Sequence, residues 1–294
     1  MSESLSGYKI GFIGLGNMGW PMACHLHDAQ AEMVVWNRSE PRRRAAEDHA
    51  MEVASSAVEV AENVEDGILC LNLTYSAVVE EVFSEIQDGM GPGITVIDFG
   101  TTGYAETRGL ADRLAEKGGE WIDAPVSGGQ VGAEAGDLTI MCGGSEMGFR
   151  RVLPVLEVLG GKITHLGGVG AGQVTKLANQ LIVAQTIDAV AQALRLAEKA
   201  GLDPGKVREA LRGGFAESRI LELHGERMVR RDFEPGGRSA LQLKDVRLMH
   251  ELAAEVGLDS STLENSLKLW ERFVDELGHG DLDHSGLFRL YEED

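Results

Sequence analysis

Short apolar runs alternate with longer polar, alanine-rich stretches through the first half of the chain. Each run has the length of a strand, and the stretches between them are long enough to cross over as helices. Near-continuous apolar runs are typical of strands buried on both faces, so the alternation predicts an α/β fold with a parallel sheet wound on both sides by helices. The expected strands are residues 8–13, 33–36, 67–73, 94–99 and 121–123.

The second half of the chain has a mainly helical pattern. Further strands are expected at 138–142 and 162–166, and a glycine-dense turn, GGVGAG, follows at 167–172. We place a domain boundary in this turn, which gives an α/β domain at 1–167 and an all-helical domain at 168–294. The expected helices of the second domain are one long helix from 173 to about 200 and shorter amphipathic helices at 204–213, 219–230, 241–256 and 261–276.

The long helix carries no charged side chain between residues 177 and 187. A helix that is apolar nearly all round must be enclosed by other helices, by a second subunit, or by both. A membrane span is the wrong explanation, because Asn179, Gln180 and Asp188 would fall within it. We therefore expect a homodimer or a homotetramer.

The composition excludes several classes of protein. The 294 residues include 27 Lys and Arg against 47 Asp and Glu, a formal charge of −20, so the surface repels phosphate backbones and anionic lipid. The three cysteines have no C-x-x-C spacing, and the histidines and carboxylates show no ligand spacing, so neither a disulfide framework nor a metal site is expected. With no secretory leader and no long apolar run, a cytoplasmic location is expected, with no nucleic-acid or membrane partner.

Gly14, Gly16 and Gly19 form a G-x-G-x-x-G motif between an expected strand and an expected helix. Such a loop permits a tight turn, lets the backbone approach a pyrophosphate, and points a helix N-terminus at the phosphates. Its position directly after the apolar run KIGFI favours a dinucleotide site over a chance turn.

Asn37, Arg38 and Ser39 follow the second expected strand, where an NAD site usually has an acid to hold the ribose. No acid occurs between the end of this strand and Glu40. Arg38 could instead pair with a 2′-phosphate, and Asn37 and Ser39 could add hydrogen bonds. The loop favours NADP, with NAD as the alternative. In the simpler interpretation these residues form only the solvated start of a helix.

Ser127, Gly128 and Gly129 follow another strand end. Their consecutive backbone N–H groups and the Ser127 hydroxyl make a donor cluster suited to a carboxylate, although a plain turn explains the same residues. Lys176 opens the uncharged stretch of the long helix, with Asn179 and Gln180 on the same face. An ammonium there could donate a proton to a carbonyl oxygen that receives a hydride, or simply extend to water.

Five stretches, which are distributed over almost the whole chain, resemble the β-hydroxyacid dehydrogenase family, the 3-hydroxyisobutyrate dehydrogenase-like enzymes. The resemblance implies an N-terminal Rossmann domain, a long inter-domain helix and an all-helical domain that helps to form an oligomer. Within the family, KLANQ is most similar to the tartronate semialdehyde reductases, whereas many other members have Asn in place of Gln180. The stretches are IGFIGLGNMGWPMA (10–23), DAPVSGGQVGAEAGDLTIMCGG (123–144), GAGQVTKLANQLIVA (170–184), LKD (243–245) and GHGDLDHSGLFRLYE (278–292).

The resemblance also implies roles for individual residues. Lys176 would be the catalytic acid or base, Ser127, Gly128 and Gly129 would hold the substrate carboxylate, and Asn179 and Gln180 would orient the substrate. The remaining implied contacts are with the cofactor: Gly14, Leu15, Gly16, Asn17, Met18, Gly19, Asn37, Arg38, Ser39, Thr101, Lys244 and Asp245. Lys244 would also reach the substrate. The family's usual Ser before Thr101 is Gly100 here, which leaves the carboxamide contact open.

Together these patterns predict an NADP-dependent reductase of a short aldehyde that bears a carboxylate, with 2-hydroxy-3-oxopropanoate to glycerate as the favoured reaction. Rival substrates are 3-hydroxyisobutyrate, 3-hydroxypropionate, succinic semialdehyde, glyoxylate and a sulfonated aldehyde. Arg219 and Arg238 are either additional anion contacts or surface residues. Imine reduction and a catalytically silent NADP-binding module are rival classes, and Lys176 counts against both.

Overall fold

The structure is a computed structural model that describes residues 4–292. The chain folds as two compact units, and the division falls after Lys176, within the long helix α8 (Ala171–Lys199). No helix in the described part of the chain is both long and apolar enough to span a membrane.

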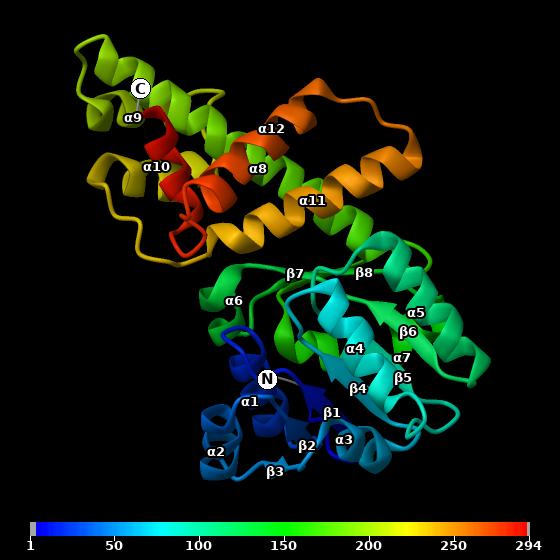
Figure 1. Cartoon of the computed structure of the whole chain (residues 1–294). Coiled ribbons are helices and arrows are strands. Elements are labelled where there is room, and N and C mark those ends of the chain that lie inside the picture. The colour runs from blue at the N-terminus through cyan, green and yellow to red at the C-terminus, as the bar shows by residue number, and fades with distance from the viewer. Residues whose placement is uncertain (1–3, 293–294) are drawn as a thin grey trace. The chain divides into compact units, whose positions relative to one another are not determined.

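A six-stranded, fully parallel sheet forms the centre of the first unit (Figure 1). Its strand order is β3-β2-β1-β4-β5-β6, so the order reverses between β1 and β4, where ligands of such sheets bind. This confirms the predicted α/β class. The strands are β1 (Lys9–Ile13), β2 (Glu32–Trp36), β3 (Glu52–Val53), β4 (Ile68–Leu71), β5 (Thr95–Asp98) and β6 (Glu120–Asp123).

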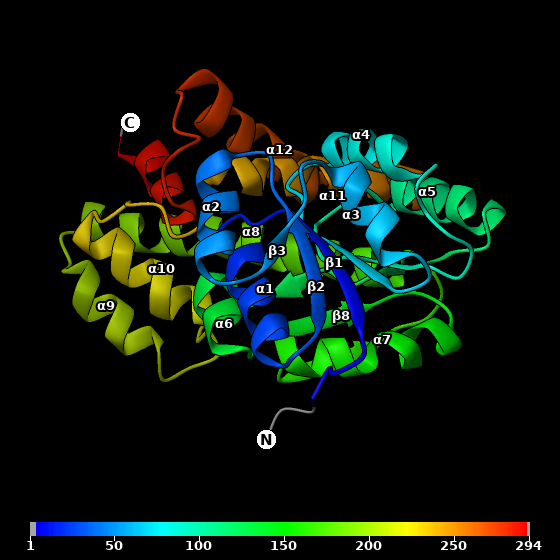
Figure 2. The ribbon, with the colours of Figure 1, turned by 90° about the horizontal axis from the view of Figure 1, so that it is seen from below.

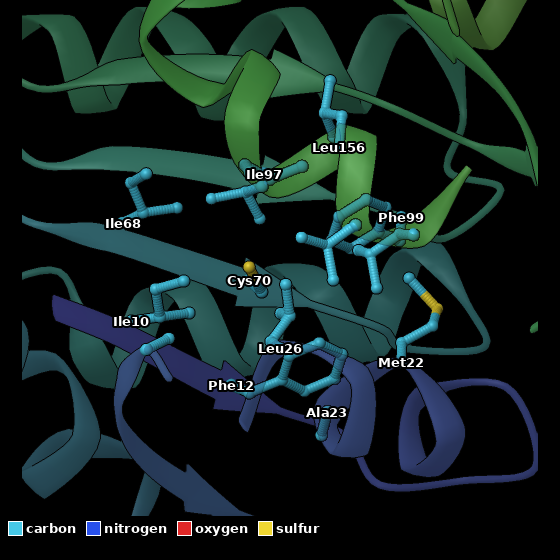
Figure 3. Packing of buried hydrophobic residues seen from close by; sticks show 14 of the residues in the cluster. Ile10, Phe12, Met22, Ala23, Leu26, Ile68, Cys70, Ile97, Phe99 and Leu156 are labelled. Carbon is cyan, nitrogen blue, oxygen red and sulfur yellow. The ribbon is translucent and has the colours of Figure 1, made fainter. Parts of the chain in front are cut away.

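Both faces of the sheet are buried, which explains the near-continuous apolar runs. Alternate side chains of one strand enter different cores: Ile68 and Cys70 enter one cluster, whereas Leu69 and Leu71 enter the other. Figure 3 shows the first cluster, in which Phe12 packs near Leu26 of α1. Helices α1 (Gly19–Asp28) and α7 (Glu146–Leu159) supply that core, and α3 (Ala57–Val64), α4 (Ser76–Ile86) and α5 (Tyr104–Glu116) supply the other.

The first unit differs from the prediction in its short elements. The strands expected at 138–142 and 162–166 exist as β8 (Thr139–Cys142) and β9 (Lys162–His165), but they form a separate sheet with β7 (Val126–Ser127). The two-residue strands β3 and β7 are too short to show a hydrophobic period, so the sequence did not predict them. Two further helices are α2 (Glu40–Asp48) and α6 (Gly129–Ala135), the latter where a plain turn was the alternative.

The second unit is helical. Its helices after α8 are α9 (Pro204–Leu211), α10 (Arg219–Arg230), α11 (Ser239–Val256) and α12 (Ser261–Glu271). Figure 1 shows α11 beside α12, and Figure 2 shows α9 beside α10. The helix expected at 261–276 is present, but after Glu271 it continues as a π-helix (Arg272–Glu276). A 3-10 helix (His284–Tyr291), which the sequence pattern did not predict, follows it.

Asp123, at the end of β6, fastens the start of α8 to the sheet. One carboxylate oxygen accepts the Gly170 N–H at 2.7 Å and the other accepts the Gln173 N–H at 2.9 Å. Burial raises the pKa of Asp123 to about 6, although the backbone N–H groups favour its charged form. The first turn of a helix has N–H groups without partners in the helix, so this side chain satisfies two of them.

We predict that Asp123→Ala destabilises the first unit. The substitution removes the acceptor of two buried N–H groups, each of which costs about 1–3 kcal/mol when left unsatisfied. The free energy of unfolding, measured by urea denaturation, should fall by several times the effect of Asp112→Ala, a matched change at an exposed position of α5. Equal stability of the two variants would contradict the anchoring role.

Candidate functional site

The glycine loop between β1 and α1 leaves an open backbone surface. A Cβ at Gly14 (φ +104°) would lie 2.3 Å from the Asn72 carbonyl oxygen, and one at Gly19 would lie 1.9 Å from the Gly14 carbonyl oxygen. At Gly16, by contrast, a Cβ would meet nothing within 4 Å. Within residues 4–292, no side chain caps the N-terminus of α1. The loop therefore fits a dinucleotide pyrophosphate: two glycines permit tight packing, and the third leaves room for the phosphates beside uncapped N–H groups.

The end of β2 closes against this loop. Asn37 Oδ1 accepts the Leu15 N–H at 2.8 Å, and Asn37 Nδ2 donates to Ser39 Oγ at 2.8 Å. Arg43 donates to the Asn37 and Arg38 carbonyl oxygens at 2.8 and 2.9 Å, which holds the turn. The Arg38 side chain is exposed and forms no hydrogen bond or ion pair with any residue from 4 to 292. Of the three residues predicted to hold the ribose end, only Arg38 keeps a side chain uncommitted within the described fold.

Of two hollows in the described part of the first unit, the larger one is not at the carboxyl ends of the strands. It measures about 520 Å³ and lies at the starts of β5 and β6, beside Ile94 and Glu120. The other, about 290 Å³, is lined by Asn17, Trp20 and Arg42 next to the glycine loop. Ligands of open parallel sheets bind at the carboxyl ends of the strands, so the smaller hollow is better placed than the larger one to take part in a ligand site.

The loop after β5 is held by two buried side chains that the sequence did not single out. Asp98 accepts from the Gly100 N–H at 2.9 Å and from Thr102 Oγ1 at 2.6 Å. Gln173 of α8 donates to the Gly100 carbonyl oxygen at 2.9 Å. A Cβ at Gly100 would lie 2.6 Å from the Leu73 carbonyl oxygen, so this backbone does not admit the Ser usual in the family without moving. Thr101, between these contacts, is half-buried.

The structure brings Lys176 together with the predicted carboxylate-binding segment. Its Nζ donates to the Val126 carbonyl oxygen at 2.8 Å, and the side chain is only 9% exposed. Ser127 follows directly in β7 and is half-buried, whereas Gly128 (φ +137°) and Gly129 (φ +62°) are exposed in conformations that favour glycine. A cationic donor and a row of backbone donors therefore lie side by side.

The remaining predicted site residues gather within the second unit. Gln180 of α8 donates from Nε2 to Asp245 of α11 at 2.5 Å, and Lys244 Nζ lies 3.0 Å from the other Asp245 oxygen. Asn179 Nδ2 donates to Gln180 Oε1 at 2.9 Å. Two neighbouring residues of α8 and two neighbouring residues of α11 thus form one polar cluster, with 65 positions between Gln180 and Asp245.

The two arginines left open by the sequence are engaged on the surface. Arg219 pairs with Glu222, and Arg238 pairs with Asp281. Both guanidinium groups are more than half exposed, and each has a carboxylate partner from its own unit. Their geometry favours the surface interpretation over an additional anion contact.

Known families match both units of the chain. Residues 9–167 match the NAD binding domain of 6-phosphogluconate dehydrogenase. Residues 170–291 match the family described as NAD-binding of NADP-dependent 3-hydroxyisobutyrate dehydrogenase. The matches therefore assign a nicotinamide cofactor to the fold that carries the glycine loop.

Full-length relatives agree with these matches. The 2-hydroxy-3-oxopropionate reductase of Escherichia coli (strain K12) is 43% identical and covers 97% of each chain. The 2-(hydroxymethyl)glutarate dehydrogenase of Eubacterium barkeri is 32% identical over 97% of this chain and 95% of that protein. A solved structure of Mycobacterium tuberculosis 3-hydroxyisobutyrate dehydrogenase with L-serine has a TM-score of 0.88 at 30% identity, covering 96% of this chain and 98% of that one.

The glycine loop, the buried lysine beside its donor segment and the agreement over the whole length lead to one assignment. The chain belongs to the 3-hydroxyisobutyrate dehydrogenase-like β-hydroxyacid dehydrogenase family and is an NAD(P)-dependent oxidoreductase.

Proposed function

We propose that the protein is an NADP-dependent reductase of 2-hydroxy-3-oxopropanoate, which it converts to glycerate. The observation that carries this proposal is the position of Lys176, buried and hydrogen-bonded to Val126 directly beside the Ser127–Gly129 donors. A substrate with a carboxylate and a nearby aldehyde suits such a pair of donor sites. The 43% identity to an E. coli protein named 2-hydroxy-3-oxopropionate reductase supports this choice over the rival semialdehydes.

In the proposed mechanism the backbone N–H groups of residues 127–129 hold the substrate carboxylate and fix the aldehyde near Lys176. A nicotinamide cofactor held by the glycine loop would supply the hydride-transfer chemistry at the aldehyde carbon. Protonated Lys176 gives its proton to the aldehyde oxygen, which becomes the new hydroxyl, and regains a proton from solvent. In the oxidative direction the neutral lysine takes the hydroxyl proton. The Val126 carbonyl oxygen keeps the ammonium in place through its hydrogen bond.

Substrate choice is tested by turnover with NADPH. Purified protein is offered 2-hydroxy-3-oxopropanoate, succinic semialdehyde, glyoxylate, methylmalonate semialdehyde and a sulfonated aldehyde, and the loss of NADPH absorbance is recorded. The proposal expects the highest kcat/KM with 2-hydroxy-3-oxopropanoate. A higher value with another member of the panel would replace the substrate but keep the chemistry. An imine is offered in a parallel assay, and turnover of the imine with none of the aldehydes reduced would replace the chemistry.

Lys176→Ala should lower kcat by about 10²–10⁴-fold, the range typical of losing a general acid. Binding of NADPH, followed by fluorescence titration, should stay close to that of the wild type, because the glycine loop does not involve the lysine. Lys176→Arg should be nearly as poor, since a guanidinium does not release its proton at neutral pH. Lys199→Ala, a lysine at the far end of α8, is the matched control. Retained turnover in Lys176→Ala would refute the mechanism.

Arg38→Asp should shift the cofactor preference from NADPH toward NADH. The wild-type guanidinium is exposed and uncommitted within the described fold, so it can form a charge-assisted bond with a 2′-phosphate worth about 1.5–3 kcal/mol. The kcat/KM for NADPH should fall by one to two orders of magnitude at that energy, while the value for NADH is kept or rises. Arg44→Asp changes the same charge at an exposed site paired with Glu40 and should leave the preference unchanged. Wild-type protein that favours NADH would contradict the assignment.

We also propose that a second subunit covers the exposed part of α8. Ile182 lies in the uncharged stretch and is 68% exposed, and Leu196 further along the helix is 72% exposed. Light scattering should show a dimer or a larger oligomer, and Ile182→Glu should weaken it, because a buried charge without a partner is costly. A stable wild-type monomer at micromolar concentration would remove this proposal.

A further inference from the structure

The polar cluster within the second unit is almost completely buried. Gln180, Gln242 and Asp245 are 9%, 1% and 6% exposed. Buried amides and carboxylates are costly unless each finds a partner of the opposite hydrogen-bonding type. The arrangement of donors and acceptors in this cluster is therefore constrained by energy.

The Asp245 carboxylate determines which end of the Gln180 amide faces it. A carboxylate offers only acceptors, so the amide must present its N–H group, and Gln180 Nε2 lies 2.5 Å from Asp245 Oδ2. The other Asp245 oxygen lies 3.0 Å from the Lys244 ammonium, with which it forms an ion pair. A flipped Gln180 would set its oxygen against the carboxylate.

Gln242 is compatible with this orientation, and its Oε1 lies 3.5 Å from Gln180 Nε2. The Gln242 Nε2 is buried and has no hydrogen-bond partner among residues 4–292, so a flip of Gln242 would turn this donor toward the oxygen of a flipped Gln180. The Asp245 carboxylate, which offers acceptors alone, is therefore the group that decides the orientation of Gln180.

The orientation of Gln180 passes on to Asn179. With its N–H group toward Asp245, Gln180 turns its oxygen to Asn179, whose Nδ2 donates to it at 2.9 Å. Asn179 is thereby fixed with its Oδ1 directed away from Gln180, and only half-buried. The terminal torsion of an Asn side chain is broad and roughly two-fold, so an amide without such a constraint can exchange the positions of its donor and acceptor.

We infer that Asp245 is a positioning residue, which acts through Gln180 to fix the amide of Asn179 so that its oxygen is presented to the substrate. The inference rests on the proposed function in one respect, the contact of Asn179 with the substrate. It explains why a Gln in this position is useful: its longer side chain reaches Asp245 while its oxygen still holds Asn179.

The test exchanges the donor and acceptor groups at positions 180 and 245. Asp245→Asn removes the constraint and Gln180→Glu opposes two carboxylates, so each should lower kcat/KM by roughly 10- to 100-fold, as expected for hydrogen bonds to charged groups. In the double variant the new amide at 245 donates to the new carboxylate at 180, which still accepts from Asn179. Its kcat/KM should recover to within about fivefold of the wild type. A loss equal to the product of the two single losses would overturn the inference.

A second cycle separates positioning from a merely structural role. In an Asn179→Ala background, Asp245→Asn should cause little further loss of kcat/KM, because its effect passes through Asn179. An equal loss in both backgrounds would show that Asp245 only supports the fold. Gln180→Met, which removes both bonds without adding charge, gives the same comparison if Asp245→Asn unfolds.

The controls keep this inference distinct from the proposed function. Gln192→Glu makes the same substitution on α8 beside Asp188, which Gln192 contacts at 2.8 Å on the surface, and should leave kcat/KM unchanged. If Asn179→Ala alone retains full kcat/KM, Asn179 does not act on the substrate and the inference is wrong. The proposed function stands or falls separately, with the turnover of the wild type and of Lys176→Ala.

Discussion

The contact on which the first unit's site depends is the pair of hydrogen bonds from the start of α8 to Asp123. A strand end and a helix start are both rich in unsatisfied backbone groups, and here one carboxylate satisfies the helix from the end of the strand. Because α8 starts at a fixed point, the position of every residue in its first turns is fixed with it. Gln173 can then hold the loop at Gly100, and Lys176 can reach the Val126 carbonyl oxygen.

The side chains around the glycine loop mainly support the backbone. Asn37 accepts the Leu15 N–H, and Arg43 donates to the turn after β2. The surface left for a ligand is then made largely of backbone N–H groups and the open side of Gly16, with Arg38 as the exposed charge. Such a surface suits phosphates, since main-chain donors need no rearrangement when an anion binds.

Within the second unit the organising principle is the direction of hydrogen bonds rather than charge alone. Lys244 forms an ion pair with one oxygen of Asp245. The other Asp245 oxygen accepts from Gln180 and thereby orients the Gln180 amide. Buried amides are strongly directional, because exchanging oxygen and nitrogen turns each attraction into a repulsion. A substitution between Asn and Gln in such a cluster therefore changes which neighbours can be reached and which atom faces outward.

The sequence by itself determined the features that depend on local patterns. The five long strands, the glycine loop and the long helix follow from apolar period, glycine spacing and the absence of charge, all of which act over a few residues. The family motifs indicated Lys176 and the Ser127–Gly129 segment, and the structure places them side by side. The substrate and the cofactor preference stay predictions.

Only the tertiary structure decided how distant polar groups pair. Asp98, Asp123 and Gln173 look like ordinary polar residues in the sequence, and nothing local shows that Gln173 meets Gly100, 73 positions away. The two-residue strands β3 and β7 have too few residues to show a period, and the 3-10 helix at the C-terminal end is stabilised by packing rather than by propensity. Asp245 and Gln180, 65 positions apart, could not be paired from the sequence for the same reason. The folded backbone determines which distant polar groups come within hydrogen-bond distance, and local sequence patterns do not show this.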